Sequence, residues 1–218
     1  MIQDIWPKHL DNQYKNLKPG NEDTVFYFQG SSLLARPSGH FNSQNPEENV
    51  LIYPQYDEFV QGIKSSYGDK AVDNFEFIYL LSIDEEHFFL ARKTGSLERG
   101  TFLGEMADSA VHKDMYSFVR GYEFIGVDSF RKAQPREHAY AAITAFHLYG
   151  WYRDNHFCGR CGKPLKHDDK QRMLRCYCCK NMVFPKICPA VIVAVTDKDR
   201  ILPVSYTHLR AHETLSDL

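Results

Sequence analysis

The sequence predicts an α+β protein in which a β-rich N-terminal domain and a linking helix precede a small cysteine-rich metal module. Short apolar and aromatic runs separated by turn residues fill the first 133 residues, a helical period begins near Arg136, and all six cysteines lie between residues 158 and 188. The chain has 218 residues, of which 43% are hydrophobic and 25% are charged. This length and composition suffice for one large or two modest globular domains.

Residues 1–133 are predicted to form the β-rich domain. Aromatic and β-branched residues gather in short stretches, which is typical of strands, and Gly, Asn, Pro and Ser separate these stretches. Residues 36–39 are predicted as a turn and residues 83–87 as a hairpin. A short helix is expected within residues 51–67 and a late strand at residues 122–125. The clearest predicted strands are residues 25–28, 32–35, 75–81 and 87–91.

Residues 134–156 are predicted to contain the linking helix. Ala139, Ala142 and Phe146 recur at helical spacing, directly after Pro135, which is favourable at the start of a helix. Alanines along one flank would let another element approach closely.

Charge and hydropathy exclude several classes of protein. The net charge is −2, which gives no global reason to expect binding to nucleic acid. No apolar run approaches the roughly 18 residues that a membrane span needs. The N-terminal residues carry acids, amides and a proline instead of the basic start and apolar stretch of a secretory signal. The sequence therefore predicts a cytoplasmic protein without a membrane contact.

The cysteines form two Cys-x-x-Cys pairs that predict a zinc ribbon at residues 157–189. Cys158 and Cys161 form the first pair, and Cys176 and Cys179 the second. Each pair makes a tight turn in which two thiolates face one ion, so two such turns complete the tetrahedron that zinc prefers. Four protein ligands leave no position for a reacting water, and the predicted zinc is therefore structural.

The other two cysteines are not assigned to the metal. Cys178 competes with Cys179 on paper, but the step from Cys176 to Cys178 is one residue too short for the usual turn. Cys188 lies next to prolines and is predicted to be a small buried apolar residue. In the first pair, Gly159 and Gly162 are expected to relieve backbone strain.

The chain resembles the NADH pyrophosphatase family of the Nudix hydrolase superfamily, also described as NAD-cap decapping hydrolases. Residues 151–162, the second cysteine pair and residues 184–195 carry the resemblance. It implies that the ribbon is followed by a Nudix α/β domain, of which residues 190–204 would be the first strands. Those strands are expected at residues 191–196 and 201–204.

The resemblance also implies an activity and two substrate contacts. The family hydrolyses the pyrophosphate of NADH, NAD⁺ or NAD-capped RNA to a nicotinamide mononucleotide and AMP, using Mg²⁺ or Mn²⁺, and homodimers are common in it. Phe184 falls where many members place a substrate-pocket tyrosine, although a core position is an equal alternative for it. Gln171 falls where some members place an acidic substrate contact.

The sequence departs from the family where catalysis would occur. A Nudix box consists of a glycine followed by spaced glutamates and an Arg-Glu pair, whose carboxylates hold the catalytic ions. No such box is present in these residues. We therefore expect this chain to be an inactive fragment. Residues 205–218 resemble a terminal string found on unrelated chains, and we predict them to be a non-native tail.

A zinc-ribbon module that binds nucleic acid or a protein partner is the alternative function. Residues 151–190 carry nine Lys or Arg against three Asp, a formal charge of +6. Zinc with four thiolates would leave about +4. Such a patch can attract RNA or DNA phosphates, steer an anionic dinucleotide to a neighbouring site, or be only a solvated surface.

Overall fold

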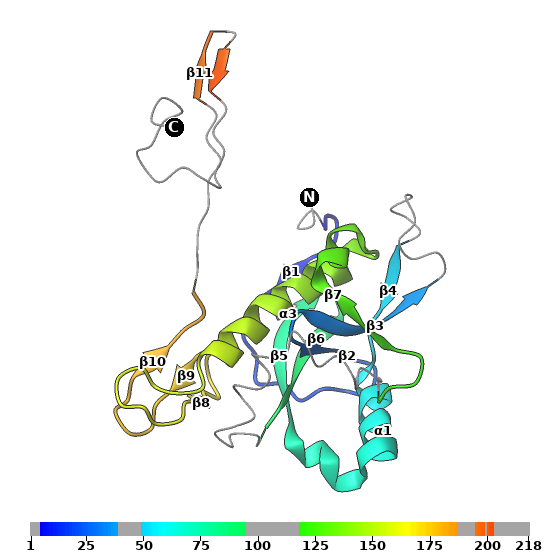
Figure 1. Ribbon diagram of the computed structural model, residues 1–218, viewed down its shortest axis with the longest axis vertical. Coiled ribbons are helices and arrows are strands. Elements are labelled where there is room, and N and C mark those ends of the chain that lie inside the picture. The colour runs from blue at the N-terminus through cyan, green and yellow to red at the C-terminus, as the bar shows by residue number, and fades with distance from the viewer. Residues whose placement is uncertain (1–4, 39–48, 95–117, 187–194, 199, 203–218) are drawn as a thin grey trace. The chain divides into compact units, whose positions relative to one another are not determined.

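A computed structural model describes most of the chain, and the chain forms two compact units, Met1–Pro185 and Lys186–Leu218 (Figure 1). None of the described helices is long and apolar enough to cross a membrane. The described residues are 5–38, 49–94, 118–186, 195–198 and 200–202.

The first unit is built around a seven-stranded mixed sheet. Its strand order is β1-β5-β6-β2-β3-β4, and β7 also pairs with β3. The pair β2 and β6 is parallel, whereas the other strand pairs in this sheet are antiparallel. The strands are β1 (Leu10–Asp11), β2 (Thr24–Gln29), β3 (Ser32–Ser38), β4 (Val50–Ile52), β5 (Phe75–Ile83), β6 (Glu86–Lys93) and β7 (Glu123–Gly126).

Helices cover both faces of this sheet. Helix α1 (Tyr56–Tyr67) packs on one face, and α3 (Arg136–Asp154) packs on the other (Figure 1). Side chains of a strand alternate between the faces, so Phe26 contributes to the core under α3 while Val25 contributes to the core under α1. The short 3₁₀ helices η2 (Asp69–Asn74) and η3 (Val127–Lys132) precede β5 and α3.

A bulge in β5 interrupts the alternation of side chains between the two faces of the sheet and directs an extra side chain to the core under α3. The register between β5 and β6 shifts between Tyr79 and Leu81. Leu80 and Leu81 therefore both lie in the core under α3, although they are neighbours in the chain. This bulge leaves the Leu80 carbonyl available to a partner outside the sheet.

Helix α3 meets the sheet through small side chains, which agrees with the close approach that its alanine flank permits. Ala139, Ala142 and Ala145 are fully or almost fully buried, and the helix contacts β2, β5 and β6. Its last turn carries Trp151 and Tyr152 into the same core. The helix thus joins the sheet to the segment that follows it.

The sequence-based predictions for the N-terminal domain are confirmed for its main elements and wrong at one turn. The four clearest strands, the hairpin, the helix within residues 51–67 and the late strand are present. Residues 36–38 do not turn, because Arg36, Pro37 and Ser38 continue β3 and pair with β4. A proline is tolerated there as the strand departs from its pairing with β2 and β7. The short strands β1 and β4 were not predicted.

The cysteine-rich segment forms a small three-stranded antiparallel sheet within the first unit. Its order is β10-β9-β8, and each strand is two residues long. The strands are β8 (Lys166–His167), β9 (Leu174–Arg175) and β10 (Met182–Val183). Segment 157–183 is called the ribbon below.

In the second unit, the structure describes one hairpin. Strands β11 (Val195–Asp197) and β12 (Arg200–Leu202) pair antiparallel, and Lys198 has the positive φ of a tight turn. The pairing of β11 with β12 agrees with the two strands expected at residues 191–196 and 201–204, with the turn between them. The rest of the predicted Nudix strands, Cys188 and residues 205–218 lie outside the described residues.

Candidate metal centre and its surroundings

Four cysteine thiols of the ribbon converge on one point. The Sγ atoms of Cys158, Cys161, Cys176 and Cys179 all lie within 4.8 Å of one another. The Sγ atoms of Cys158 and Cys179 lie 3.5 Å apart, and those of Cys161 and Cys176 lie 3.4 Å apart. Zn–S bonds of about 2.3 Å place the sulfurs of a tetrahedral site about 3.8 Å apart. The geometry therefore fits a metal ion such as zinc.

Two turns of the same construction present these thiols. In the first, the Gly162 amide donates to the Cys158 carbonyl at 2.8 Å, and the Cys158 amide donates to the Lys163 carbonyl at 2.8 Å. In the second, the Lys180 amide donates to the Cys176 carbonyl at 2.9 Å, and the Cys176 amide donates to the Asn181 backbone carbonyl at 2.8 Å. The two halves of the site therefore repeat one local hydrogen-bond pattern.

Each turn ends on a residue in the left-handed region. Gly162 has φ of +68°, as expected for the glycine of the first turn, and Lys180 has φ of +62° at the corresponding position of the second. Gly159 is not required by strain, because its φ is not positive and a Cβ there would meet nothing within 4 Å. The expectation for Gly159 is therefore wrong, and the role of Lys180 was not predicted.

Backbone amides prepare two of the thiols for ionisation. The Arg160 amide, helped by that of Cys161, lowers the pKa of Cys158 to about 6. The Cys179 amide likewise lowers the pKa of Cys176. Because a metal binds thiolates and not thiols, amides directed at the sulfurs favour the form that binds.

The remaining described cysteine lies outside this group. Cys178 is exposed, whereas Cys158 and Cys176 are buried. In the described part of the chain, these four thiols are the sole group of three or more His, Cys, Asp or Glu side chains close enough to share an ion. No carboxylate cluster suited to Mg²⁺ or Mn²⁺ accompanies them there.

The ribbon is attached to the sheet by a shared core and by one arginine. Leu174 is 1% exposed and belongs to the core under α3. The Arg172 guanidinium donates to the Leu80 carbonyl at the β5 bulge, and to the Asn12 carbonyl at 3.4 Å. It also lies over the Tyr14 ring.

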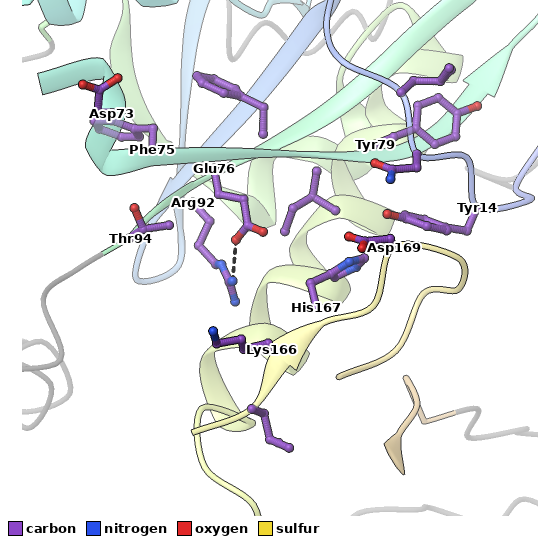
Figure 2. Close-up of a pocket in the computed structure, with 15 residues that line it drawn as sticks. Tyr14, Asp73, Phe75, Glu76, Tyr79, Arg92, Thr94, Lys166, His167 and Asp169 are labelled. Atoms are coloured by element: carbon purple, nitrogen blue, oxygen red, sulfur yellow. Dashed lines mark hydrogen bonds and ion pairs between the residues drawn. The ribbon is translucent and has the colours of Figure 1, made fainter. Parts of the chain in front are cut away.

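A cleft of about 580 Å³ lies where the ribbon meets the edge of β5. Figure 2 shows His167 and Asp169 of the ribbon beside Tyr14, with Arg92 and Glu76 opposite. Arg92 pairs with Glu76 at 2.5 Å, so both charges have a partner inside the cleft. The cleft thus presents a balanced mixture of acids and bases, which does not select an anion.

The two residues predicted to contact substrate lie elsewhere on the ribbon side of the unit. Phe184 follows β10 and is 49% exposed, so it is not a core residue. Gln171 lies in the turn between β8 and β9. Its backbone N–H donates to the Asp168 carboxylate at 3.2 Å, and its backbone carbonyl accepts from the Met173 N–H. Neither lines the cleft described above.

Comparison with known proteins gives one consistent name over a limited stretch. No family model matches the chain. The NAD-capped RNA hydrolase NudC of Pseudomonas aeruginosa is 38% identical over 52 residues, which are 24% of this chain and 19% of that protein. The NudC of Klebsiella pneumoniae is 35% identical over 63 residues, 29% of this chain and 24% of that protein. The NudC of Pseudomonas putida is 40% identical over 52 residues, 24% of this chain and 19% of that protein.

These matches set the extent of the similarity. About a quarter of this chain is similar to hydrolases of NAD-capped RNA, and the matched part is about a fifth to a quarter of those proteins. The resemblance noted in the sequence is therefore supported over this stretch.

Proposed function

We propose that this chain supplies the N-terminal domain and zinc ribbon of a Nudix-type hydrolase that cleaves the pyrophosphate of NAD⁺, NADH or NAD-capped RNA. Water would cleave the bond between the two phosphates, giving a nicotinamide mononucleotide and AMP or a 5′-monophosphate RNA. The observation that carries the proposal is the 35–40% identity to curated NAD-capped RNA hydrolases.

In this proposal the four thiols hold a structural zinc ion. The ion would tie the two turns of the ribbon together, and its four protein ligands leave no position for a reacting water. Cys158, Cys161, Cys176 and Cys179 are the proposed ligands, supported by the mutual approach of their Sγ atoms within 4.8 Å. The zinc would therefore maintain the fold and not perform the hydrolysis.

The catalytic Mg²⁺ or Mn²⁺ would need carboxylates that these residues do not supply, because the sequence lacks a Nudix box. Phe184 is proposed to stack on the substrate, which its 49% exposure permits. Gln171 is proposed as a neutral substrate contact at the tip of the ribbon hairpin.

Two measurements test this function. The zinc-loaded chain, incubated with NADH and Mg²⁺ or Mn²⁺, is expected to release no nicotinamide mononucleotide above the metal-only control. Sequencing the coding DNA beyond the codon for Val204 is expected to show a reading frame that encodes a Nudix box. Substantial hydrolysis by this chain, or a frame that closes without such a box, would contradict the proposal.

A further inference from the structure

The ribbon sheet separates its side chains into a buried row and an outer row. His167, Leu174 and Val183 are cross-strand neighbours, and Leu174 and Val183 pack into the core under α3. The residues next to them, Lys166, Arg175 and Met182, form the other row of partners. Since adjacent residues of a strand point to opposite sides, this second row faces away from the core.

The outer row continues into an exposed aromatic ring. Tyr177 is 55% exposed, and the Lys166 Nζ lies 5.8 Å from the centre of its ring. Met182, at the other end of the row, is 51% exposed. Lys166, Arg175, Tyr177 and Met182 are called the ribbon face below.

The ribbon that carries this face has an excess of positive charge. Arg175 is engaged by Asp168 at 3.1 Å, and Arg172 is directed at backbone carbonyls on the sheet side. Besides Lys166, the ribbon exposes four cations to solvent, Arg160, Lys163, Lys170 and Lys180, against one exposed anion, Asp169. The positive charge that the sequence places in this segment is thus mostly available on the surface.

We propose that the ribbon face binds single-stranded RNA, with a base stacked on Tyr177 and phosphates held by Lys166 and by other exposed cations of the ribbon. An exposed aromatic ring beside a cation can bind unpaired nucleotides without sequence preference, because every base offers a π-face. Protein interfaces, by contrast, are depleted of lysine. The choice of RNA as the strand rests on the proposed function, since a capped RNA carries a single-stranded body beyond the cap.

Fluorescence anisotropy of a labelled, uncapped RNA of about 12 nucleotides tests the proposal, because that length covers the site sizes of single-strand binders. The zinc-loaded chain is expected to bind it, with affinity falling as salt rises. Tyr177→Ala is expected to weaken binding about tenfold, whereas Tyr177→Phe keeps the ring and the affinity. Lys166→Ala is expected to reduce the slope of log affinity against log salt by about 0.7.

Matched controls come from α1 and η2, outside the ribbon. Tyr67 is 65% exposed and Lys70 is exposed, so Tyr67→Ala and Lys70→Ala remove the same chemical groups elsewhere. Zinc content of each ribbon variant checks that the turns are intact, and Lys166→Ala tests the face without touching the cysteine turn. Equal affinities of Tyr177→Ala and Tyr67→Ala, or unchanged salt slopes for Lys166→Ala, would overturn the proposal. Because the RNA is uncapped and nothing is hydrolysed, such a failure leaves the proposed hydrolase function to its own test.

Discussion

The N-terminal sheet and the ribbon obtain their stability from different sources. The sheet buries both of its faces under α3 and α1, with fully buried aromatic residues such as Phe26, Phe88 and Phe89. The ribbon has strands of two residues and leaves Tyr177 and Met182 exposed. A region with so little buried apolar surface needs another source of stability, and the four thiols indicate a metal ion. The comparison indicates that the sheet relies on its buried core, whereas the ribbon is expected to rely on an ion held by its four thiols.

Side chains of the sheet, of α3 and of the ribbon pack against one another at a junction. Tyr152, in the last turn of α3, is 1% exposed and lies beside His167 of the ribbon, with 5.7 Å between ring centres. The Arg92 guanidinium of β6 lies 5.0 Å from the same Tyr152 ring. Loss of order in the ribbon is therefore expected to reach this junction and to stop there.

Removing the metal should have the largest effect of any single change. Chelation of zinc is expected to unfold the ribbon, because structural zinc supplies about 10–16 kcal/mol of apparent binding free energy in small metal modules. The sheet is expected to persist. Hydrogen exchange with and without chelator checks this: amides of 157–183 should lose protection, while those of β2, β5 and β6 keep it. Equal loss in both regions would show that the sheet also depends on the ion.

Single cysteine variants should separate the cysteines that bind the zinc from the one that does not. Cys176→Ser is expected to lose the zinc, since Cys176 is buried in the thiol cluster. Cys178→Ser is the matched control, because Cys178 is exposed and lies outside that cluster. Metal content per chain measures both. Full zinc in the Cys176 variant together with loss in the Cys178 variant would reverse the assignment of ligands.

Much of this comparison could be predicted from the sequence, because its signals are local. Short apolar and aromatic stretches indicated the main strands, the helical spacing after Pro135 indicated α3, and the spacing of the cysteine pairs indicated which four thiols meet. Each of these signals depends on the geometry of a few consecutive residues. Such patterns need no knowledge of the rest of the fold.

Other features depend on distant residues and could not be predicted. The segment 36–38 has the composition of a turn, but pairing with β4 keeps it extended. The left-handed conformation of Lys180 follows from the hydrogen bonds that close the second turn. The attachment of Arg172 to the Leu80 carbonyl requires the bulge in β5, which no local pattern announces.

A substitution in the core of the sheet should destabilise the sheet without weakening zinc binding by the ribbon. Its effect is expected to be smaller than that of metal removal. Phe88 is fully buried and stacks on Phe26 with 5.8 Å between ring centres. Phe88→Ala is expected to lower the free energy of unfolding of the sheet by about 3–5 kcal/mol, because it removes a buried ring and leaves a cavity. Tyr67→Ala, at an exposed site, should change it by less than about 0.5 kcal/mol. Denaturant unfolding followed by circular dichroism measures both. If zinc affinity fell together with sheet stability, the two regions would not be separable.

The smallest expected effect concerns the junction and appears as a dependence on pH. Burial lowers the pKa of His167 below its ordinary value of 6.5, and the Tyr14 and Tyr152 rings lie 5.2 Å and 5.7 Å from the imidazole. The unfolded chain therefore takes up a proton at a higher pH than the folded chain does. Stability from this residue is present above pH 6.5 and is lost as the pH falls below that value toward the folded-state pKa. His167→Gln should flatten the fall in unfolding free energy between about pH 8 and pH 5, measured with zinc present. His147→Gln, at an exposed position on α3, should leave the slope unchanged. Identical slopes for the two variants would mean that the junction does not sense pH through His167.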